Sequence, residues 1–227
     1  MGRAGFASTR SARGGPRGRG VQALAAFVAA AGLLLAHAGG ALGGSGGTAA
    51  PGGGGGAKDC VAMQFGKRAL ERGDCGSDVE TLNWILRSRA YDVSLRHRFG
   101  VSTHDSVRHV QGREGLRRTG VVDTPTRTAI VKAMKRHRAS WYGPGFWGNT
   151  TACGQTLKRG TVGVAHRSLP CGTKVVIGYS GRFLRTKVID RGPYVKRRYE
   201  RDWDLTQAAA SRLGFEGVQT VRAAVIR

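Results

Sequence analysis

The length of 227 residues allows one or two domains, and only part of the chain has the apolar content to form a core. Lys and Arg outnumber Asp and Glu by 37 to 14, which gives a formal net charge of +23. Such a charge favours polyanions in general, through electrostatic steering and counterion release, so it does not by itself indicate a specific nucleic-acid partner.

The first 38 residues have the pattern of a secretory signal. Residues 1–20 hold five arginines and no acid, residues 21–35 are almost wholly apolar, and Ala36-His37-Ala38 offers small residues for a signal peptidase. An uncleaved membrane anchor is the alternative, but about 20 apolar residues are needed to span a bilayer and this run is shorter. Residues 39–56 are mostly glycine and predict a flexible linker.

Residues 57–135 predict a small domain of three short helices. Ser77-Asp78-Val79-Glu80 has the form of a capping box, and apolar residues recur after it at helical spacing, so a first helix is expected at about 78–88. Thr103 is expected to cap the second helix. The third is expected to begin at Thr124-Pro125, with proline at its first position.

The segment from 139 to 227 predicts an all-β barrel with one inserted helix. Short β-branched runs alternate there with Gly and Pro, and Gly214 provides the end of the helix. Residues 134–140 are expected to be a basic junction, with His137 as a solvated linker residue. The β-branched runs are Thr161–Val164, Thr173–Ile177, Phe183–Ile189 and Val218–Ile226.

Several separate motifs of this segment resemble the rare lipoprotein A (RlpA) family. They lie in order over about eighty residues, and the resemblance implies a six-stranded double-psi β-barrel that handles cell-wall glycan. Better known members of that family are lytic transglycosylases of peptidoglycan. The motifs are Ala139-Ser140-Trp141-Tyr142-Gly143-Pro144-Gly145-Phe146, Thr151-Ala152-Cys153-Gly154, Val164-Ala165-His166-Arg167-Ser168-Leu169-Pro170-Cys171-Gly172-Thr173, Asp190-Arg191-Gly192-Pro193-Tyr194 and Asp204-Leu205-Thr206.

Residues 64–133 resemble the peptidoglycan-binding three-helix domain that lies beside many wall hydrolases. The resemblance departs from the usual pattern before Phe99, where Arg96-His97-Arg98 replaces an expected Asp-Gly turn. The alternative is a spacer domain whose apolar periodicity only forms a core.

Two carboxylates, Asp190 and Asp204, stand 14 positions apart in the barrel segment. Glycan hydrolysis usually needs a pair of carboxylates. A lytic transglycosylase can use a single acid/base residue, because the sugar's own hydroxyl is the nucleophile and an anhydro-sugar end results. Asp204 is the first candidate for this role, but Asp204-Leu205-Thr206-Gln207 also fits a helix cap. Asp190 either lies in the glycan groove, with Arg191 available to pair with it, or stabilises a turn.

Two further positions are assigned by the family resemblance. His166 matches a groove histidine that could orient a carboxylate or contact the sugar. Gln155 stands where active relatives carry Glu, and an amide can bind a sugar but cannot transfer a proton at neutral pH. Activity would therefore depend on Asp204 or Asp190, or else the barrel would bind and loosen glycan without cutting it, as expansins do.

Aromatic residues near the start of the barrel segment are candidates for sugar stacking. Tyr142, Phe146 and Trp147 offer flat faces of the kind that sugar rings stack on. Trp141 has the same chemistry, but filling the end of a small barrel is at least as good an interpretation of it.

Four cysteines in an exported chain predict two disulfides, although four cysteines allow three connectivities. We expect Cys60 with Cys75 and Cys153 with Cys171, because each pair lies within one predicted domain. The chain has no C-x-x-C spacing, so a zinc site is not indicated, and no cofactor is expected.

The sequence therefore predicts a secreted, cell-wall-associated protein of two domains, a monomer whose partners are peptidoglycan glycan strands and anionic wall polymers. The predicted activity is endolytic transglycosylase, and the alternative is a non-catalytic wall-binding or wall-loosening protein. Binding of nucleic acid through the cationic surface would be weak, salt-sensitive and blind to sequence. The candidate catalytic residues are Asp204, Asp190 and His166, and the candidate substrate-binding residues are Gln155, Tyr142, Phe146, Trp147 and Arg191.

Overall fold

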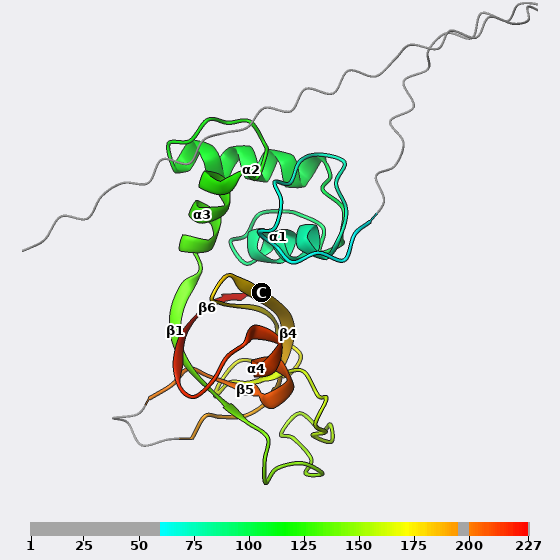
Figure 1. The fold of residues 1–227 in the computed structure, drawn as a ribbon, viewed down its shortest axis with the longest axis vertical. Coiled ribbons are helices and arrows are strands. Elements are labelled where there is room, and N and C mark those ends of the chain that lie inside the picture. The colour runs from blue at the N-terminus through cyan, green and yellow to red at the C-terminus, as the bar shows by residue number, and fades with distance from the viewer. Residues whose placement is uncertain (1–59, 195–199, 227) are drawn as a thin grey trace, which may run out of the picture. The chain divides into compact units, whose positions relative to one another are not determined.

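A computed structural model describes residues 60–194 and 200–226 (Figure 1). The secretory signal expected at 1–38 and the linker expected at 39–56 lie outside these residues. Within the described ranges, no helix is both long and apolar enough to cross a membrane.

Three helices precede the barrel: α1 (Ser77–Arg87), α2 (Val101–Arg113) and α3 (Thr124–Lys132). Their apolar faces meet in one core, as the helical spacing predicts. The largest fully buried side chains of this core are Leu70, Leu82, Ile85, Leu86, Phe99 and Ile130.

Two of the expected helix caps are wrong. The residue that caps α1 is Gly76, and the Ser77 hydroxyl lies inside the helix and donates to the Met63 carbonyl at 2.6 Å. Thr103 lies inside α2, where its hydroxyl donates to the Asn83 side-chain oxygen at 2.9 Å. Both hydroxyls thus bind groups far away in the sequence, which a local cap pattern cannot indicate.

The third helix begins at Thr124, as expected, but Asp123 rather than Thr124 caps it. The Asp123 carboxylate accepts a hydrogen bond from the backbone N–H of Thr126 at 3.0 Å. This bond satisfies one of the free donors at the start of the helix, and Pro125 fits the first turn because it has no N–H to lose.

The C-terminal part is a closed six-stranded barrel with strand order β1-β5-β2-β4-β3-β6, which confirms the predicted barrel (Figure 1). Helix α4 (Gln207–Leu213) is inserted between β5 and β6, and Gly214 ends it in the left-handed conformation at φ 65°. The strands are β1 (Lys135–Tyr142), β2 (Val164–Ala165), β3 (Lys174–Tyr179), β4 (Arg182–Asp190), β5 (Trp203–Thr206) and β6 (Gln219–Val225).

Strand β1 corrects the expected basic junction at 134–140. It begins at Lys135, three residues after the last residue of α3, and it pairs with β5 on one side and β6 on the other. Its first half carries exposed basic side chains, so the apolar alternation typical of a strand is hidden in the sequence. His137 was expected in a linker but is part of this strand. Its Nδ1 lies 3.2 Å from Oδ2 of Asp202.

The helical part and the barrel share a hydrophobic core. Val176 of β3 and Ala224 of β6 are buried within the core that the helices form. The rings of Phe65 and Phe183 meet edge to face with centroids 5.3 Å apart. An ion pair between Glu80 of α1 and Arg185 of β4 adds a polar contact.

Both expected disulfides are present. Cys60 is bonded to Cys75, beside the start of α1, and Cys153 is bonded to Cys171. The second bond joins the long loop after β1 to the loop between β2 and β3, so it anchors the loop that carries Gln155.

Candidate active site

Four neighbouring strands bring the two candidate carboxylates into one line across the barrel. Ser140 of β1 pairs with Asp204 of β5. Asp204 and Asp190 of β4 both pair with Ala165 of β2, which lies between them. Because neighbouring strands lie 4.7–4.9 Å apart, the Cα atoms of the two aspartates are about 10 Å apart. The intervening side chain is only a methyl group, which leaves room for a ligand between the carboxylates.

Asp190 and Asp204 line the same groove, whose volume is about 520 Å³. Its other walls include Trp141, Tyr142 and Phe146. Tyr194, also in the wall, is 78% exposed and Phe146 is 54% exposed, so both rings are available to a ligand. The groove therefore combines two carboxylates with aromatic faces.

The surroundings of Asp204 raise the pKa of its carboxyl group. It is partly buried in β5, and the Ser140 hydroxyl donates to its Oδ1 at 2.7 Å. Burial raises the pKa of Asp204 above its usual value, and the negative charge of Asp190 adds to this effect, while the Ser140 hydrogen bond and Arg201 oppose it. A carboxyl group with a raised pKa is suited to general-acid catalysis.

The interpretation of Asp204 as a helix cap is wrong. The residue that caps α4 is Thr206, whose hydroxyl accepts from the backbone N–H of Ala209 at 3.3 Å. Asp204 lies two residues earlier, in the strand, so its side chain is not used to begin the helix.

Asp190 is fixed in orientation by three hydrogen bonds. Its Oδ1 accepts from the backbone N–H groups of Ala152 and Arg191, both at 2.8 Å. Its Oδ2 accepts from the Tyr142 hydroxyl at 3.2 Å. Burial, together with the charge of Asp190, raises the pKa of Tyr142, so this hydroxyl keeps its proton and acts as a donor.

The side chain of Arg191 was expected to pair with Asp190, but it binds elsewhere. Its guanidinium donates from Nη1 to the Leu169 carbonyl at 3.0 Å, and only its backbone N–H reaches the carboxylate. Arg191 still lines the groove, so it remains a candidate contact for substrate.

His166 lies outside the carboxylate groove. It directly follows Ala165, and successive side chains of an extended chain point to opposite sides, so a histidine at this position faces away when Ala165 faces the groove. Its ring packs on Trp203 at 4.6 Å, and its Nδ1 accepts from the backbone N–H groups of Ser168 and Leu169. Burial lowers the pKa of His166, although the charge of Asp202 opposes this shift. The backbone N–H of His166 donates to the Asp190 carbonyl at 3.2 Å, so this residue helps to fix the backbone of Asp190.

Gln155 belongs to a turn beside the groove rather than to its wall. The Gln155 carbonyl accepts from the backbone N–H of Thr151 at 2.8 Å, and its own N–H donates to the Thr151 hydroxyl. The same turn carries Ala152, which binds Asp190, and Cys153, which is bonded to Cys171. The turn therefore positions Asp190, while the Gln155 side chain is not among the residues that line the groove.

Trp147 also lies outside the groove wall. The guanidinium of Arg159 covers its ring at 4.2 Å from the centroid, a cation–π contact. Of the three aromatic residues expected to bind sugar, the structure brings Tyr142 and Phe146 together with the carboxylates.

Sequence reasoning missed Ser140 and Tyr194 as site residues. Ser140 stands two positions before Tyr142, so strand alternation places both on one face once 135–142 is recognised as a strand. Tyr194 lies at the end of the Asp-Arg-Gly-Pro-Tyr motif, and its high exposure is a property that the motif does not indicate.

Comparison with known proteins identifies similar domains in both parts of the chain. Residues 134–225 match the family model described as "Lytic transglycolase", and residues 75–130 match the one described as "Putative peptidoglycan binding domain".

Two curated relatives illustrate the similarity. The chain is 43% identical over 96 residues to a protein of Aquifex aeolicus named "Probable endolytic peptidoglycan transglycosylase RlpA", which covers 40% of this chain and 41% of the relative. It is 40% identical over 92 residues to the "Endolytic peptidoglycan transglycosylase RlpA" of Campylobacter jejuni, which covers 39% of this chain and 32% of the relative. The match thus spans less than half the length of either relative.

Among solved structures, the expansin of Clavibacter michiganensis matches with a TM-score of 0.34 and 24% identity, over 41% of this chain and 50% of that one.

Proposed function

We propose that this chain, an RlpA-like double-psi β-barrel protein with a peptidoglycan-binding-like domain before the barrel, is a lytic transglycosylase that cleaves peptidoglycan glycan strands. The observation that carries the proposal is the single groove lined by both Asp190 and Asp204, in which burial raises the pKa of Asp204. The names of the curated relatives and the peptidoglycan-binding-like domain support the same substrate. They also support a place outside the cytoplasm, in contact with the cell wall.

In this proposal Asp204 acts first as acid and then as base. Its proton passes to the glycosidic oxygen as the bond from that oxygen to the sugar's anomeric carbon breaks. A hydroxyl of the same sugar then bonds to the anomeric carbon and gives its proton to the Asp204 carboxylate, which restores the starting state. No water is consumed, so one chain end carries an anhydro-sugar, and one residue accounts for both proton transfers.

Asp190 has a different role in this mechanism. Positive charge develops on the sugar ring in an oxocarbenium-like transition state. A carboxylate held by Tyr142, Ala152 and the backbone of Arg191 can stabilise that charge without having to reorient. The exposed rings of Phe146 and Tyr194 would stack on sugars on either side of the scissile bond.

The second candidate function is a non-catalytic wall-binding or wall-loosening protein. It is favoured by Gln155, because an amide cannot replace the Glu of active relatives in proton transfer. However, the Gln155 side chain does not line the groove, so the chemistry proposed for Asp204 does not need a carboxylate at position 155. Gln155 is therefore weak support for the second function.

The two functions are separated by incubating the protein, without residues 1–38, with glycan strands stripped of peptides, and analysing the products by mass spectrometry. We expect anhydro-ended fragments from the wild type and a loss of at least about 100-fold in rate from Asp204→Asn. Asp202→Asn is the matched control, because Asp202 is close in sequence but lies outside the groove wall. Binding of strands without any product would support the second function, and unchanged cleavage by Asp204→Asn would remove Asp204 from the mechanism.

A further inference from the structure

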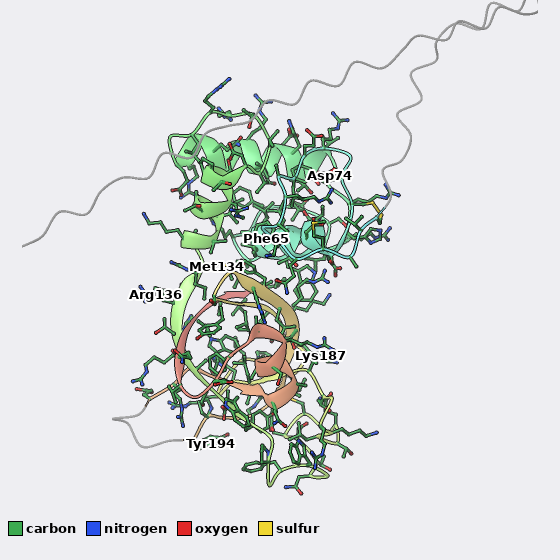
Figure 2. All side chains as sticks on the ribbon, viewed as in Figure 1. Phe65, Asp74, Met134, Arg136, Lys187 and Tyr194 are labelled. Carbon is green, nitrogen blue, oxygen red and sulfur yellow. A yellow bond between two sulfur atoms is a disulfide. The ribbon has the colours of Figure 1, made fainter. Side chains whose placement is uncertain are left out.

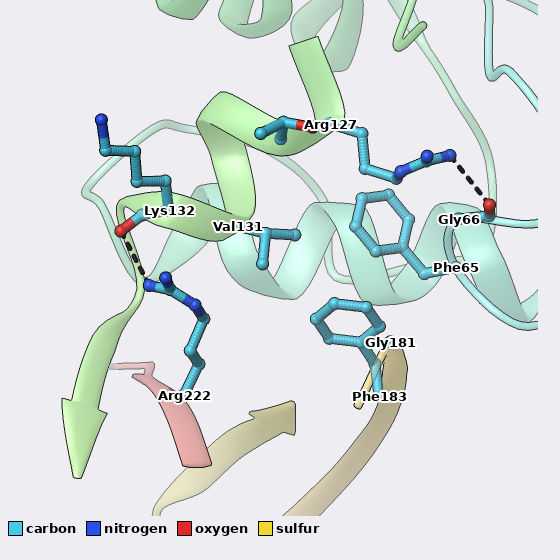
Figure 3. A pocket seen from close by; sticks show the side chains of 9 residues that line it. Phe65, Gly66, Arg127, Val131, Lys132, Gly181, Phe183 and Arg222 are labelled. Atoms are coloured by element: carbon cyan, nitrogen blue, oxygen red, sulfur yellow. Dashed lines mark hydrogen bonds between the residues drawn. The ribbon is translucent and has the colours of Figure 1, made fainter. Parts of the chain in front are cut away.

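A second hollow lies where α3 packs against the barrel, away from the carboxylates (Figure 3). Two adjoining cavities of about 490 and 290 Å³ share part of their lining and so form one continuous furrow, which we name the seam furrow. The shared residues are Val131, Gly181, Phe183 and Arg222.

The seam furrow is cationic. Arg127, Lys132, Arg136 and Arg222 line it, and none of the described residues in its lining is acidic. Nη1 of Arg127 donates to the Gly66 carbonyl at 2.8 Å, and Nη1 of Arg222 donates to the carbonyl of Lys132 at 3.0 Å (Figure 3). These bonds fix two guanidinium groups in place, and each group has five N–H donors, so further donors remain for a ligand.

Two of these cations stand at paired positions on neighbouring strands of the barrel. Arg136 of β1 is the direct partner of Arg222 in the antiparallel pairing of β1 with β6. Like charges directly opposite on a sheet destabilise it. An anion bound beside the two strands would reduce this repulsion, so the pairing is compatible with an anionic ligand.

The floor of the seam furrow is apolar. Phe183 and Val131 line it, and the Phe183 ring is held edge to face against Phe65. Small methyl-bearing groups fit such a floor better than a bare inorganic ion does. A ligand with carboxylates and small apolar side chains matches both features, and the peptide stems of peptidoglycan have this chemistry.

We propose that the seam furrow binds the carboxylate-bearing peptide stems of peptidoglycan. The proposal rests on the proposed function for its substrate class. The furrow and the active-site groove lie toward opposite ends of the barrel, as Arg136 and Tyr194 show in Figure 2. Arg136 and Tyr142 are six residues apart on β1, a separation of about 20 Å. The two sites can therefore hold different parts of one wall fragment, and their affinities then reinforce each other.

The test compares soluble wall fragments that carry peptide stems with the same glycan after the stems have been removed. Binding of both is measured for the wild type, for Lys132→Glu/Arg136→Glu, and for the control Arg117→Glu/Arg118→Glu. Both double variants change the net charge equally. All four side chains are exposed, and the control pair lies outside the furrow. The two hydrogen-bonded arginines are left intact so that folding is preserved.

We expect the wild type and the control to prefer stem-bearing fragments, and the furrow variant to lose at least about tenfold in affinity for them while binding stripped glycan as before. The proposal is overturned if the furrow variant keeps the preference, if the control loses as much, or if the wild type shows no preference. It is also overturned if a glycerol-phosphate polymer, tested in parallel, is the ligand that the furrow variant fails to bind. Cleavage of stripped glycan is measured separately and reports on Asp204, so failure of the furrow proposal and failure of the enzyme proposal are distinguishable.

Discussion

At the scale of single residues, the site depends on which side of a strand each side chain occupies. Asp190 and Asp204 were identified in the sequence because each lies in a recognisable motif, and the structure places both in one groove. His166 lies in an equally recognisable motif but faces away from the groove. Motif membership therefore identified candidate residues, whereas strand register decided which of them share a site.

The hydrogen bond from Ser140 affects the pKa of Asp204, which a substitution can test. The bond opposes the raised pKa of Asp204, so Ser140→Ala should raise that pKa further. Asp204 must be protonated to act as an acid, so activity falls as the pH rises through its pKa. The alkaline limb of the pH profile of kcat/KM should move to higher pH in Ser140→Ala and return toward its original place in Ser140→Thr. A limb that stays still, or moves to lower pH, would show that Ser140 does not act on the carboxyl group that we propose as the acid.

The Asp204 carboxylate should lower the free energy of unfolding at neutral pH. A group whose pKa is raised by folding stabilises the protein at low pH, where it is protonated, and this contribution is lost as the pH rises through the folded pKa. Asp204→Asn should therefore raise the Tm at pH 7 by a few degrees and change it little at acidic pH. Thermal unfolding at both pH values tests this, and a lower Tm at pH 7 would contradict it.

At the scale of elements, the sequence predicts the helix ends and strands that are specified by residues close to them in the chain. The start of α3, the end of α4 at Gly214, and strands β3 and β4 follow from nearby proline, glycine and β-branched residues. Strand β1 and the four-residue β5 were missed, because they are defined by pairing with each other across more than sixty positions. The true caps of α1 and α2 are glycines, which a search for capping side chains cannot find.

The cap of α3 provides a prediction at this scale. Asp123→Ala removes the acceptor for the Thr126 N–H and should lower the free energy of unfolding by about 1 kcal/mol. Asp92→Ala is the control, because Asp92 is exposed and makes only a surface ion pair with Arg87, which should matter little. Urea denaturation measures both, and equal effects of the two substitutions would argue against the capping role.

At the scale of the whole molecule, the sequence predicts two domains, and the structure adds a hydrophobic core that the helices and the barrel share. The residue pattern changes near residue 135, where the last helix before the barrel is followed by the first strand. Composition cannot show, however, that Val176 and Ala224 of the barrel are buried against the helices. Contacts between parts that are distant in sequence are the information that local patterns lack.

The shared core predicts that the helices and the barrel unfold as one unit. Val176→Ala should lower the free energy of unfolding by about 2 kcal/mol and move a single calorimetric transition without splitting it. The calorimetric and van't Hoff enthalpies should agree for the wild type and the variant. Two separate transitions in either protein would show that the helices and the barrel fold independently.

We propose that the groove between Asp190 and Asp204 cleaves glycan with the sugar's own hydroxyl and not with water. The most direct measurement is mass spectrometry of the ends produced from peptide-free glycan strands in water enriched in oxygen-18. We expect anhydro-sugar ends that contain no heavy oxygen from the wild type, and no new ends from Asp204→Asn. New ends that carry oxygen-18, or strands that remain intact with the wild type, would contradict it.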